Sequence, residues 1–330
     1  AALQDWDALT AHSDTVRLEP DPFLKFDSAF DPVSRVNEAL TALIYLRRDV
    51  RTAPHSVVLE LQNRVLFPRH GLSAISDDYA RLALVTRLGL LYPEITPLEP
   101  VGSFTGTLTL TPEEFSYLSV SQWYVRADNQ GGGREKELFS LLRGKGILNA
   151  ANPTDPARKL YASETGELVL DGLNETMTVV TPRLEGAILK TGRPVRLDRL
   201  TVNSCSRPAS VALASLEEEK TLATADRLLL MLTTNAFNTG QVFDTVEQRI
   251  CYESGNHPAL IEAARFDLTF ENGREMPPEC WALHFNGARA EKLPVALADG
   301  RLRLQIDTGR LKYGAAFFEI SYPQGKEAHR

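Results

Sequence analysis

Nine short segments beyond Tyr161 have the composition of β-strands, and they constrain the fold of this chain more than any other feature. In order they are ELVLDG, MTVVTP, EGAILK, PVRLDRLTVN, SVALASL, RLLLMLTT, RFDLTF, CWALHF and RLRLQID. Short strands at roughly even spacing are typical of an antiparallel sandwich, whereas a parallel sheet needs longer crossovers between its strands. We therefore expect one β-sandwich domain over residues 161–330.

Turn signals between these segments agree with a sandwich. Asp299-Gly300 lies between two alternating runs, which is the place of a two-residue hairpin turn. Asn272-Gly273 and Asn286-Gly287 are further turn signals. The charge run from Glu217 to Lys220 predicts another turn, exposed to solvent and without a function of its own.

The first part of the chain has the order of elements found in an α/β unit. Asp31-Pro32 supplies a helix cap and a proline at the first helical position, and apolar residues at helical spacing extend the predicted helix to about Arg48. A strand is predicted over residues 56–61 and a second helix over residues 76–89. We interpret residues 1–95 as a partial α/β segment.

Residues 96–160 are expected to form a mixed α/β connecting region. Three prolines over residues 93–100 interrupt regular structure, and the following SFTGTLTLT alternates as a half-buried strand does. A short helix is predicted to begin at Thr111-Pro112 and another to run from Glu135 to Arg143. A domain transition is therefore expected near residue 96.

The composition argues against two classes of partner. Hydrophobic residues make up 43% and charged residues 24% of the chain, which are ordinary values for a globular protein. The net charge of −7 is spread along the sequence without a basic run, so nucleic acid is not an expected partner. No stretch approaches the ~18 to 20 apolar residues that span a bilayer, so no membrane span is expected.

The sequence shows no metal or cofactor motif. The six histidines are scattered without a spacing that would place two of them on one metal ion, so neither a metal site nor a cofactor is expected. Cys205, Cys251 and Cys280 lack CxxC spacing, and we expect reduced thiols with at most one disulfide. No GxSxG motif occurs, which disfavours a serine hydrolase.

The one local group that suggests carbohydrate chemistry is Gln4-Asp5-Trp6-Asp7. At the end of a barrel strand, Trp6 could stack on a sugar ring while Asp5 or Asp7 binds its hydroxyls. The alternative interpretation is a buried tryptophan at a strand end with acids that cap it. His12 and Asp14 follow in a loop that either lines a cleft or is plain surface.

Aromatic residues of the predicted sandwich give a second possible sugar platform. They are Tyr252, Trp281, Phe285, Phe317, Phe318 and Tyr322. The alternation of Trp281, Leu283 and Phe285 is that of one buried face, which favours a core position for most of them.

Several segments resemble bacterial glycoside-hydrolase-like proteins of the cellulase type. AALQDWDAL and DPVSRVNEALTALIYLRRDVRTAPHSVVL are similar to the last strand and helix of their (β/α)8 barrel. Similar to the accessory β-sandwich after such barrels are GILNAANPTDPARKLYASETGELVLDG, MTVVTPRLEGAIL, SVALASLEEEKTLATADRLLLMLTTNAFNTG and RLRLQIDTGRLKYGAAFFEI. The resemblance implies a TIM-barrel-like segment over residues 1–95, followed by an antiparallel β-sandwich.

The resemblance also implies a function. The parent protein would hydrolyse O-glycosyl bonds of a polysaccharide or oligosaccharide with two carboxylic acids. These glutamates lie on barrel strands four and seven, which we expect upstream of Ala1. No catalytic residue is therefore assigned, and the chain alone is expected to be inactive and to pack against an upstream barrel.

The resemblance assigns residues to carbohydrate binding and implies where the protein works. Trp6 matches the strand-eight aromatic residue that supports the sugar in the first subsite, with Asp5 and Asp7 as companions. Carbohydrate is the implied ligand, and a secreted or periplasmic location is implied. The alternative is a non-catalytic carbohydrate-binding or structural β-sandwich module.

Overall fold

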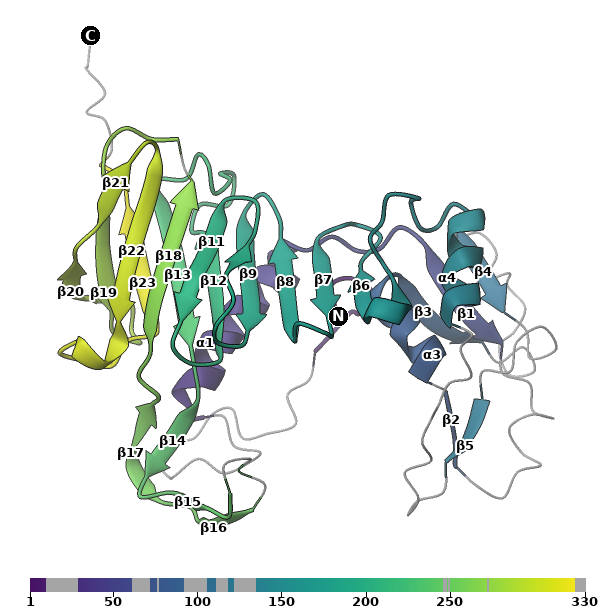
Figure 1. Cartoon of the computed structure of the whole chain (residues 1–330), viewed down its shortest axis with the longest axis horizontal. Coiled ribbons are helices and arrows are strands. Elements are labelled where there is room, and N and C mark those ends of the chain that lie inside the picture. Colours follow the sequence, from purple (N-terminus) through teal and green to yellow (C-terminus); the bar gives the residue numbers. More distant parts are fainter. Residues whose placement is uncertain are drawn as a thin grey trace. The chain divides into compact units, whose positions relative to one another are not determined.

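The chain is described from a computed structural model that covers residues 1–9, 29–60, 72–75, 77–91, 106–110, 118–121, 135–245, 248, 250–271 and 273–323 (Figure 1). It forms two compact units. The α/β unit comprises Ala1–Asp7 and Val50–Glu175, and the sandwich unit comprises Ala8–Asp49 and Thr176–Arg330. The division into 1–95, 96–160 and 161–330 stays a prediction.

A small parallel sheet organises the α/β unit. Its central strand β1 (Ser56–Glu60) lies between β3 (Arg87–Leu91) and β4 (Thr107–Leu110). The predictions of a strand over residues 56–61 and of a strand within SFTGTLTLT are confirmed. Because β4 pairs directly with β1, both segments belong to one sheet.

The helix predicted over residues 76–89 is wrong in its second half. A single helical turn, α3 (Asp77–Ala80), passes into the 3-10 helix η2 (Arg81–Leu84), and strand β3 then begins at Arg87. Parallel pairing with β1 satisfies the backbone of this segment and prevails over its weak helical periodicity. Tyr79, Leu82 and Val85 are buried, whereas Leu90 of β3 is exposed.

Helix α4 (Glu135–Gly144) confirms the helix predicted from Glu135 to Arg143. Its Leu138, Phe139 and Leu142 are buried at helical spacing against residues of the parallel sheet. The remaining elements of the unit are β2 (Leu72–Ile75), β5 (Leu118–Ser121), η4 (Pro156–Arg158), β6 (Leu160–Ala162) and β7 (Leu168–Asp171). The helix predicted at Thr111-Pro112 lies outside the described residues.

The sandwich unit contains the predicted antiparallel sheets. One sheet has the order β20-β19-β23-β13-β12-β9-β8 and the other the order β10-β11-β18-β22-β21. The first consists of β8 (Thr176–Val180), β9 (Leu184–Leu189), β12 (Ala209–Ser215), β13 (Arg227–Thr233), β19 (Glu279–Leu283), β20 (Arg289–Leu293) and β23 (Phe317–Ser321). The second consists of β10 (Val195–Arg196), β11 (Leu200–Cys205), β18 (Arg265–Glu271), β21 (Ala296–Ala298) and β22 (Arg301–Asp307), with η5 (Thr308–Arg310) after it.

Two short ribbons extend from the sandwich (Figure 1). They are β14 (Ala236–Thr239) paired with β17 (Asn256–Ile261), and β15 (Val242–Phe243) paired with β16 (Cys251–Glu253). These ribbons were not predicted, because their polar and charged residues hide the alternation of a half-buried strand. They place residues 236–261 outside the two packed sheets.

Two of the predicted hairpin turns are confirmed. Asp299 and Gly300 both have positive φ, 51° and 70°, and connect β21 to β22 as a type I′ turn does. Asn286-Gly287 connects β19 to β20, with a φ of 83° at the glycine. Asn272 lies outside the described residues. These turns fix the register of their strands.

The helix predicted from Asp31 is present, but it packs on the sandwich. Helix α1 (Pro32–Thr41) continues as the π-helix η1 (Ala42–Leu46), and the Asp31 carboxylate accepts a 2.9 Å hydrogen bond from the Val33 amide. Val36 is buried against Ala212 and Met231 on the sheet face that lies away from the sandwich core. The structure does not show a barrel helix here.

The first residues of the chain also depart from the expected barrel strand. Ala1–Asp7 forms turns, with hydrogen bonds from the amides of Gln4 and Trp6 to the Ala1 carbonyl. Asp5 has a φ of 59°, which no extended strand allows. No helix within the described ranges is long and apolar enough to cross a membrane.

A buried carboxylate fixes the segment that follows α1 and η1. The Asp49 side chain is fully buried between Arg47 and Arg183, with 2.7 Å between its Oδ1 and Nη2 of Arg183. Arg47 also donates a 2.6 Å hydrogen bond from Nη1 to the Ser215 carbonyl, at the end of β12. The arrangement neutralises a charge that would be costly to bury alone.

Replacing Asp49→Asn should lower the free energy of unfolding by about 3 kcal/mol, because two arginines would lose their buried counter-ion. Urea denaturation followed by circular dichroism measures this. The exposed Glu219→Gln variant changes the net charge equally and should leave stability unchanged. Equal effects of the two variants would show that Asp49 does not tie the segment to the sheet.

Candidate functional site

Asp5, Trp6 and Asp7 lie together on an exposed turn of the α/β unit. The indole of Trp6 is 58% exposed, so the alternative of a buried tryptophan at a strand end is wrong. Oδ1 of Asp5 lies 3.3 Å from the Thr52 hydroxyl, and Oδ2 lies 3.5 Å from Nη1 of Arg87. The turn therefore carries an exposed tryptophan whose two neighbours in the sequence are exposed acids.

Gln4 anchors this turn to the parallel sheet. Its side-chain amide donates to the carbonyls of Ala83 and Thr86 at 2.8 and 2.6 Å. Its side-chain oxygen accepts a 2.8 Å hydrogen bond from the Leu88 amide of β3. These three bonds replace the strand pairing that was expected for residues 1–7.

Arg87 connects the same turn to the segment before β1. Its Nε donates to the His55 carbonyl at 3.3 Å and its Nη2 donates to the Pro54 carbonyl at 3.2 Å. Since the same guanidinium also reaches Asp5, it holds that carboxylate beside residues 52–55. Arg87 thus positions one of the predicted sugar-binding acids.

A histidine and a glutamate that lie far apart in the sequence meet at this edge of the sheet. Nδ1 of His55 is 2.5 Å from Oε2 of Glu164, whose side chain is only 2% exposed. Glu164 Oε1 also accepts hydrogen bonds from the Thr86 hydroxyl at 2.7 Å and from the His55 amide at 3.2 Å. A carboxylate at this distance requires a proton on Nδ1, so in the neutral imidazole Nε2 is the acceptor.

The glycine that opens β4 makes room for this imidazole. A Cβ added to Gly106 would lie 2.4 Å from Cδ2 of His55, and the backbone φ there is 93°. Only glycine is compatible with both the contact and the conformation. Gly106 and Glu164 are both distant from His55 in the sequence, and Glu164 is 109 residues away, so no local signal reveals this contact.

Glu164→Ala should release the imidazole of His55 from its Nδ1–H tautomer, because the acceptor that selects this tautomer is removed. Long-range ¹H–¹⁵N NMR of the imidazole reports the tautomer. Glu60→Ala, on the same sheet, should leave the His55 signals unchanged. An unaltered tautomer in Glu164→Ala would contradict the assigned hydrogen bond.

The aromatic residues of the sandwich divide into buried and exposed ones. Phe318 and Tyr322 are buried in the core, as predicted. Trp281 alternates with the core residues Cys280 and Ala282, so it lies on the opposite face of β19. Phe285 is 45% exposed because β19 ends at Leu283. The prediction that Trp281, Leu283 and Phe285 share one buried face is therefore wrong.

Charged side chains surround Trp281. The guanidinium of Arg289 and Nζ of Lys292 lie 5.3 and 5.6 Å from its ring centroid, and its Nε1 donates to Glu279 at 3.2 Å. Cation–π contacts of this kind stabilise the ring where it lies. They occupy the indole face that a sugar would need, which disfavours Trp281 as a platform.

Glu319 of β23 is paired with Trp281 of β19 and is buried beneath the charged side chains around that ring. Arg289 Nε and Arg227 Nε donate to its two carboxylate oxygens at 2.7 and 2.8 Å. Burial opposes ionisation, yet the hydrogen bonds from Arg289 and Arg227 prevail and lower the pKa of Glu319. Its charged form therefore contributes to stability at neutral pH.

A lowered pKa means that this contribution is present above the ordinary value of 4.5 and is lost as the pH falls through the folded-state pKa. Glu319→Gln should lower the free energy of unfolding at neutral pH by about 1 kcal/mol, and the difference from wild type should shrink in acid. Urea titrations over a pH series measure it. Glu253→Gln, which changes an exposed acid, should show no such trend, and a pH-independent Glu319 effect would contradict the assignment.

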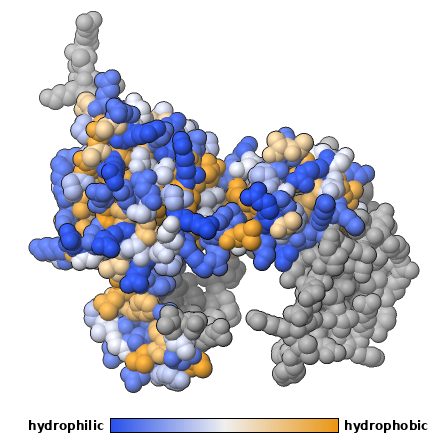
Figure 2. Space-filling model, in the orientation of Figure 1, coloured by the Kyte–Doolittle hydropathy of each residue, from blue (hydrophilic) through white to orange (hydrophobic). Residues whose placement is uncertain are grey.

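Exposed apolar side chains gather on the ribbons (Figure 2). They are Val242, Ile250, Tyr252 and Leu260, and Tyr252 is 68% exposed. Of the aromatic residues proposed as a sugar platform, Tyr252 is the most exposed.

The structure offers little for metal or thiol chemistry in the part of the chain that it describes. No group of three histidine, cysteine, aspartate or glutamate side chains converges as metal ligands among those residues. All three cysteines are free, and burial raises the pKa of Cys280 to about 12 and that of Cys205 above its ordinary value. Both buried thiols are therefore unreactive. His12 and Asp14 lie outside the described residues.

Comparison with known proteins adds no relative to this picture. No family model matches the chain, and no curated protein matches it significantly. The interpretation of the site therefore rests on the geometry of the turn with Trp6 and on the chemistry of its neighbours.

Proposed function

We propose that this chain is the closing part of a glycoside-hydrolase-like protein and that it contributes carbohydrate binding and no catalysis. Trp6 would stack on a sugar ring, and Asp5 and Asp7 would accept hydrogen bonds from its hydroxyls. The observation that carries the proposal is the exposure of Trp6 together with that of its neighbours Asp5 and Asp7 on one turn.

Physical chemistry favours a ligand on this turn. A tryptophan has a large apolar face, and leaving it in water forgoes the stabilisation that its burial would give. The turn that carries it is nevertheless held in place by Gln4 and Arg87. An exposed aromatic residue on an anchored turn, with carboxylate acceptors next to it in the sequence, has the properties of a sugar-binding subsite.

The state of the buried acids supports a non-catalytic role. Hydrolysis requires one acid that can protonate the leaving oxygen and a second that acts as nucleophile or base. The buried carboxylates of the described residues are instead engaged by donors of the protein; they are Asp49, Glu135, Glu164, Glu167, Glu185 and Glu319. We infer that these engaged acids are structural, and that a parent hydrolase would take its catalytic pair from another part of the protein.

A second candidate is a carbohydrate-binding or structural role of the sandwich itself. The exposure of Tyr252 on the ribbons and of Phe285 beyond β19 favours binding there. This candidate differs from the first in the aromatic residue that meets the sugar, so substitutions separate the two.

Trp6→Ala should weaken glycan binding by at least about tenfold, since loss of a central aromatic contact costs about 2 kcal/mol or more. Electrophoresis of the chain through gels that contain β-glucans, mannans or galactans measures retardation and substrate clearing together. Tyr252→Ala is the matched control and should retain wild-type retardation.

The other outcomes are equally informative. Retardation that is lost in Tyr252→Ala and kept in Trp6→Ala would move the site to the sandwich. Clearing of the substrate by the chain alone would refute the non-catalytic assignment. An absence of retardation on every glycan would favour the structural role.

A further inference from the structure

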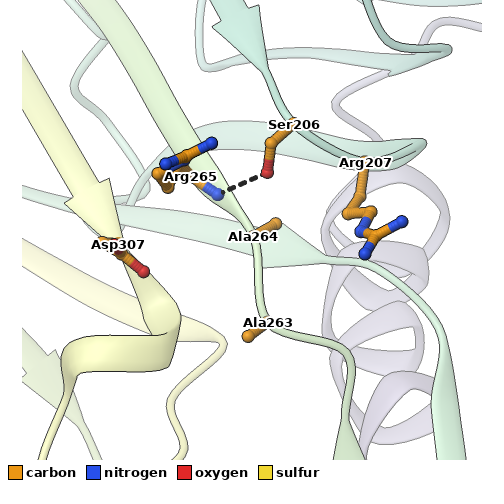
Figure 3. Close-up of a pocket in the computed structure, with 6 residues that line it drawn as sticks. All are labelled: Ser206, Arg207, Ala263, Ala264, Arg265 and Asp307. Atoms are coloured by element: carbon orange, nitrogen blue, oxygen red, sulfur yellow. Dashed lines mark hydrogen bonds between the residues drawn. The ribbon is translucent and has the colours of Figure 1, made fainter.

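A shallow cleft opens at one end of the sandwich, where three strands of the second sheet begin or end. Its volume is about 340 Å³, and it is lined by Ser206, Arg207, Ala263, Ala264, Arg265 and Asp307 (Figure 3). Ser206 and Arg207 follow β11, the two alanines precede β18, and Asp307 ends β22. This cleft belongs to the sandwich unit and is separate from the Trp6 turn.

The floor of the cleft is a fixed stretch of backbone. Ala264 accepts a 2.9 Å hydrogen bond from the Thr308 amide and donates one of 2.9 Å to the Thr308 hydroxyl. A Cβ added to Gly309 would lie 3.1 Å from Cβ of Ala263, so η5 packs closely beneath the floor. The small side chains of the two alanines leave the space above them open.

The polar groups around this floor retain donors for a ligand. The Ser206 oxygen accepts a 2.9 Å hydrogen bond from the Arg265 amide, so its own proton can be donated (Figure 3). Among the described residues, the Arg265 guanidinium makes no hydrogen bond or ion pair. Arg207 is held by Glu262 at 3.3 Å and is 57% exposed.

Asp307 explains why Arg265 is left without a partner. The two residues are opposite each other in the pairing of β18 with β22, where an ion pair would be expected. The Asp307 carboxylate instead caps η5 by accepting from the Gly309 amide at 3.1 Å, and it lies 3.3 Å from Nε of Arg310. Arg265 therefore keeps its positive charge at the rim of the cleft.

We propose that this cleft binds a small hydroxylated oxyanion, either a sugar acid or a sugar phosphate. The carboxylate or phosphate would take charge-assisted hydrogen bonds from Arg265 and Arg207, and Ser206 would donate a further one. Asp307 lies across the floor from Ser206 and Arg207, and its carboxylate, which also caps η5, would accept from ligand hydroxyls (Figure 3). The site does not depend on the sugar-binding role of Trp6.

The test is titration of the ¹⁵N-labelled full chain with glucuronate, glucose 6-phosphate, inorganic phosphate and glucose. The two sugar anions should shift the amide signals of residues 263–265 with dissociation constants of about 1 mM or below, and glucose should not. A preference between the two sugar anions identifies the oxyanion as carboxylate or phosphate.

Matched variants show whether the cleft or the general charge is responsible. Arg265→Gln should weaken binding of the sugar anions about tenfold or more, because a charge-assisted hydrogen bond is lost. Arg301→Gln, on β22 and paired with Glu271 at 3.0 Å, removes the same charge and should bind as wild type does. The proposal would be overturned if both variants weakened binding equally or if no anion gave a saturable shift. It would also be overturned if glucose bound as well as the sugar anions, or if phosphate bound as tightly as they do.

Discussion

The burial of both faces of the central strands β12 and β13 is the constraint on which the sandwich unit depends. On one face, Val211 and Leu213 pack into the core between the sheets. On the other face, Ala212 and Ala214 are covered by the helix that carries Val36. The small alanine side chains let the helix come close to the sheet, as interior packing density requires. A segment near the start of the chain is thereby part of the sandwich.

Buried carboxylates fix the edges of this three-layer arrangement. Glu185 of β9 is 1% exposed and accepts hydrogen bonds from the amides of Arg199 and Leu200, at 3.0 and 2.8 Å. These bonds join one sheet to the first residue of β11 in the other. Burial raises the pKa of Glu185, although the amides stabilise its charged form. Asp49 has the same role for the segment after α1, where two arginines supply the compensating charge.

The sequence predicts strands well where its pattern reports the environment directly. RFDLTF and RLRLQID alternate because β18 and β22 bury one face only. RLLLMLTT is nearly continuous because β13 is covered on both sides, yet nothing local says that α1 provides the cover. The helix expected over residues 76–89 fails because pairing with β1 is a long-range interaction. The contact of His55 with Glu164 is hidden for the same reason.

The candidate site shows the same division between local and distant information. The sequence identifies Asp5, Trp6 and Asp7 as a group, and the structure leaves all of them exposed. The sequence does not reveal that Arg87 and Gln4 hold the turn in place, since these contacts join segments about 80 residues apart. The anchoring of the turn by these contacts is therefore a structural finding, and its role in carbohydrate binding is our proposal.

The most direct measurement is the ¹H–¹⁵N spectrum of the indole groups during titration with soluble oligosaccharides. The chain has three tryptophans, so each indole Nε1–H signal can be assigned by substitution. Our account predicts that the Trp6 signal shifts saturably while that of Trp281, whose ring is covered by Arg289 and Lys292, stays in place. A shift of Trp281 without one of Trp6, or no indole shift with any oligosaccharide, would contradict the account.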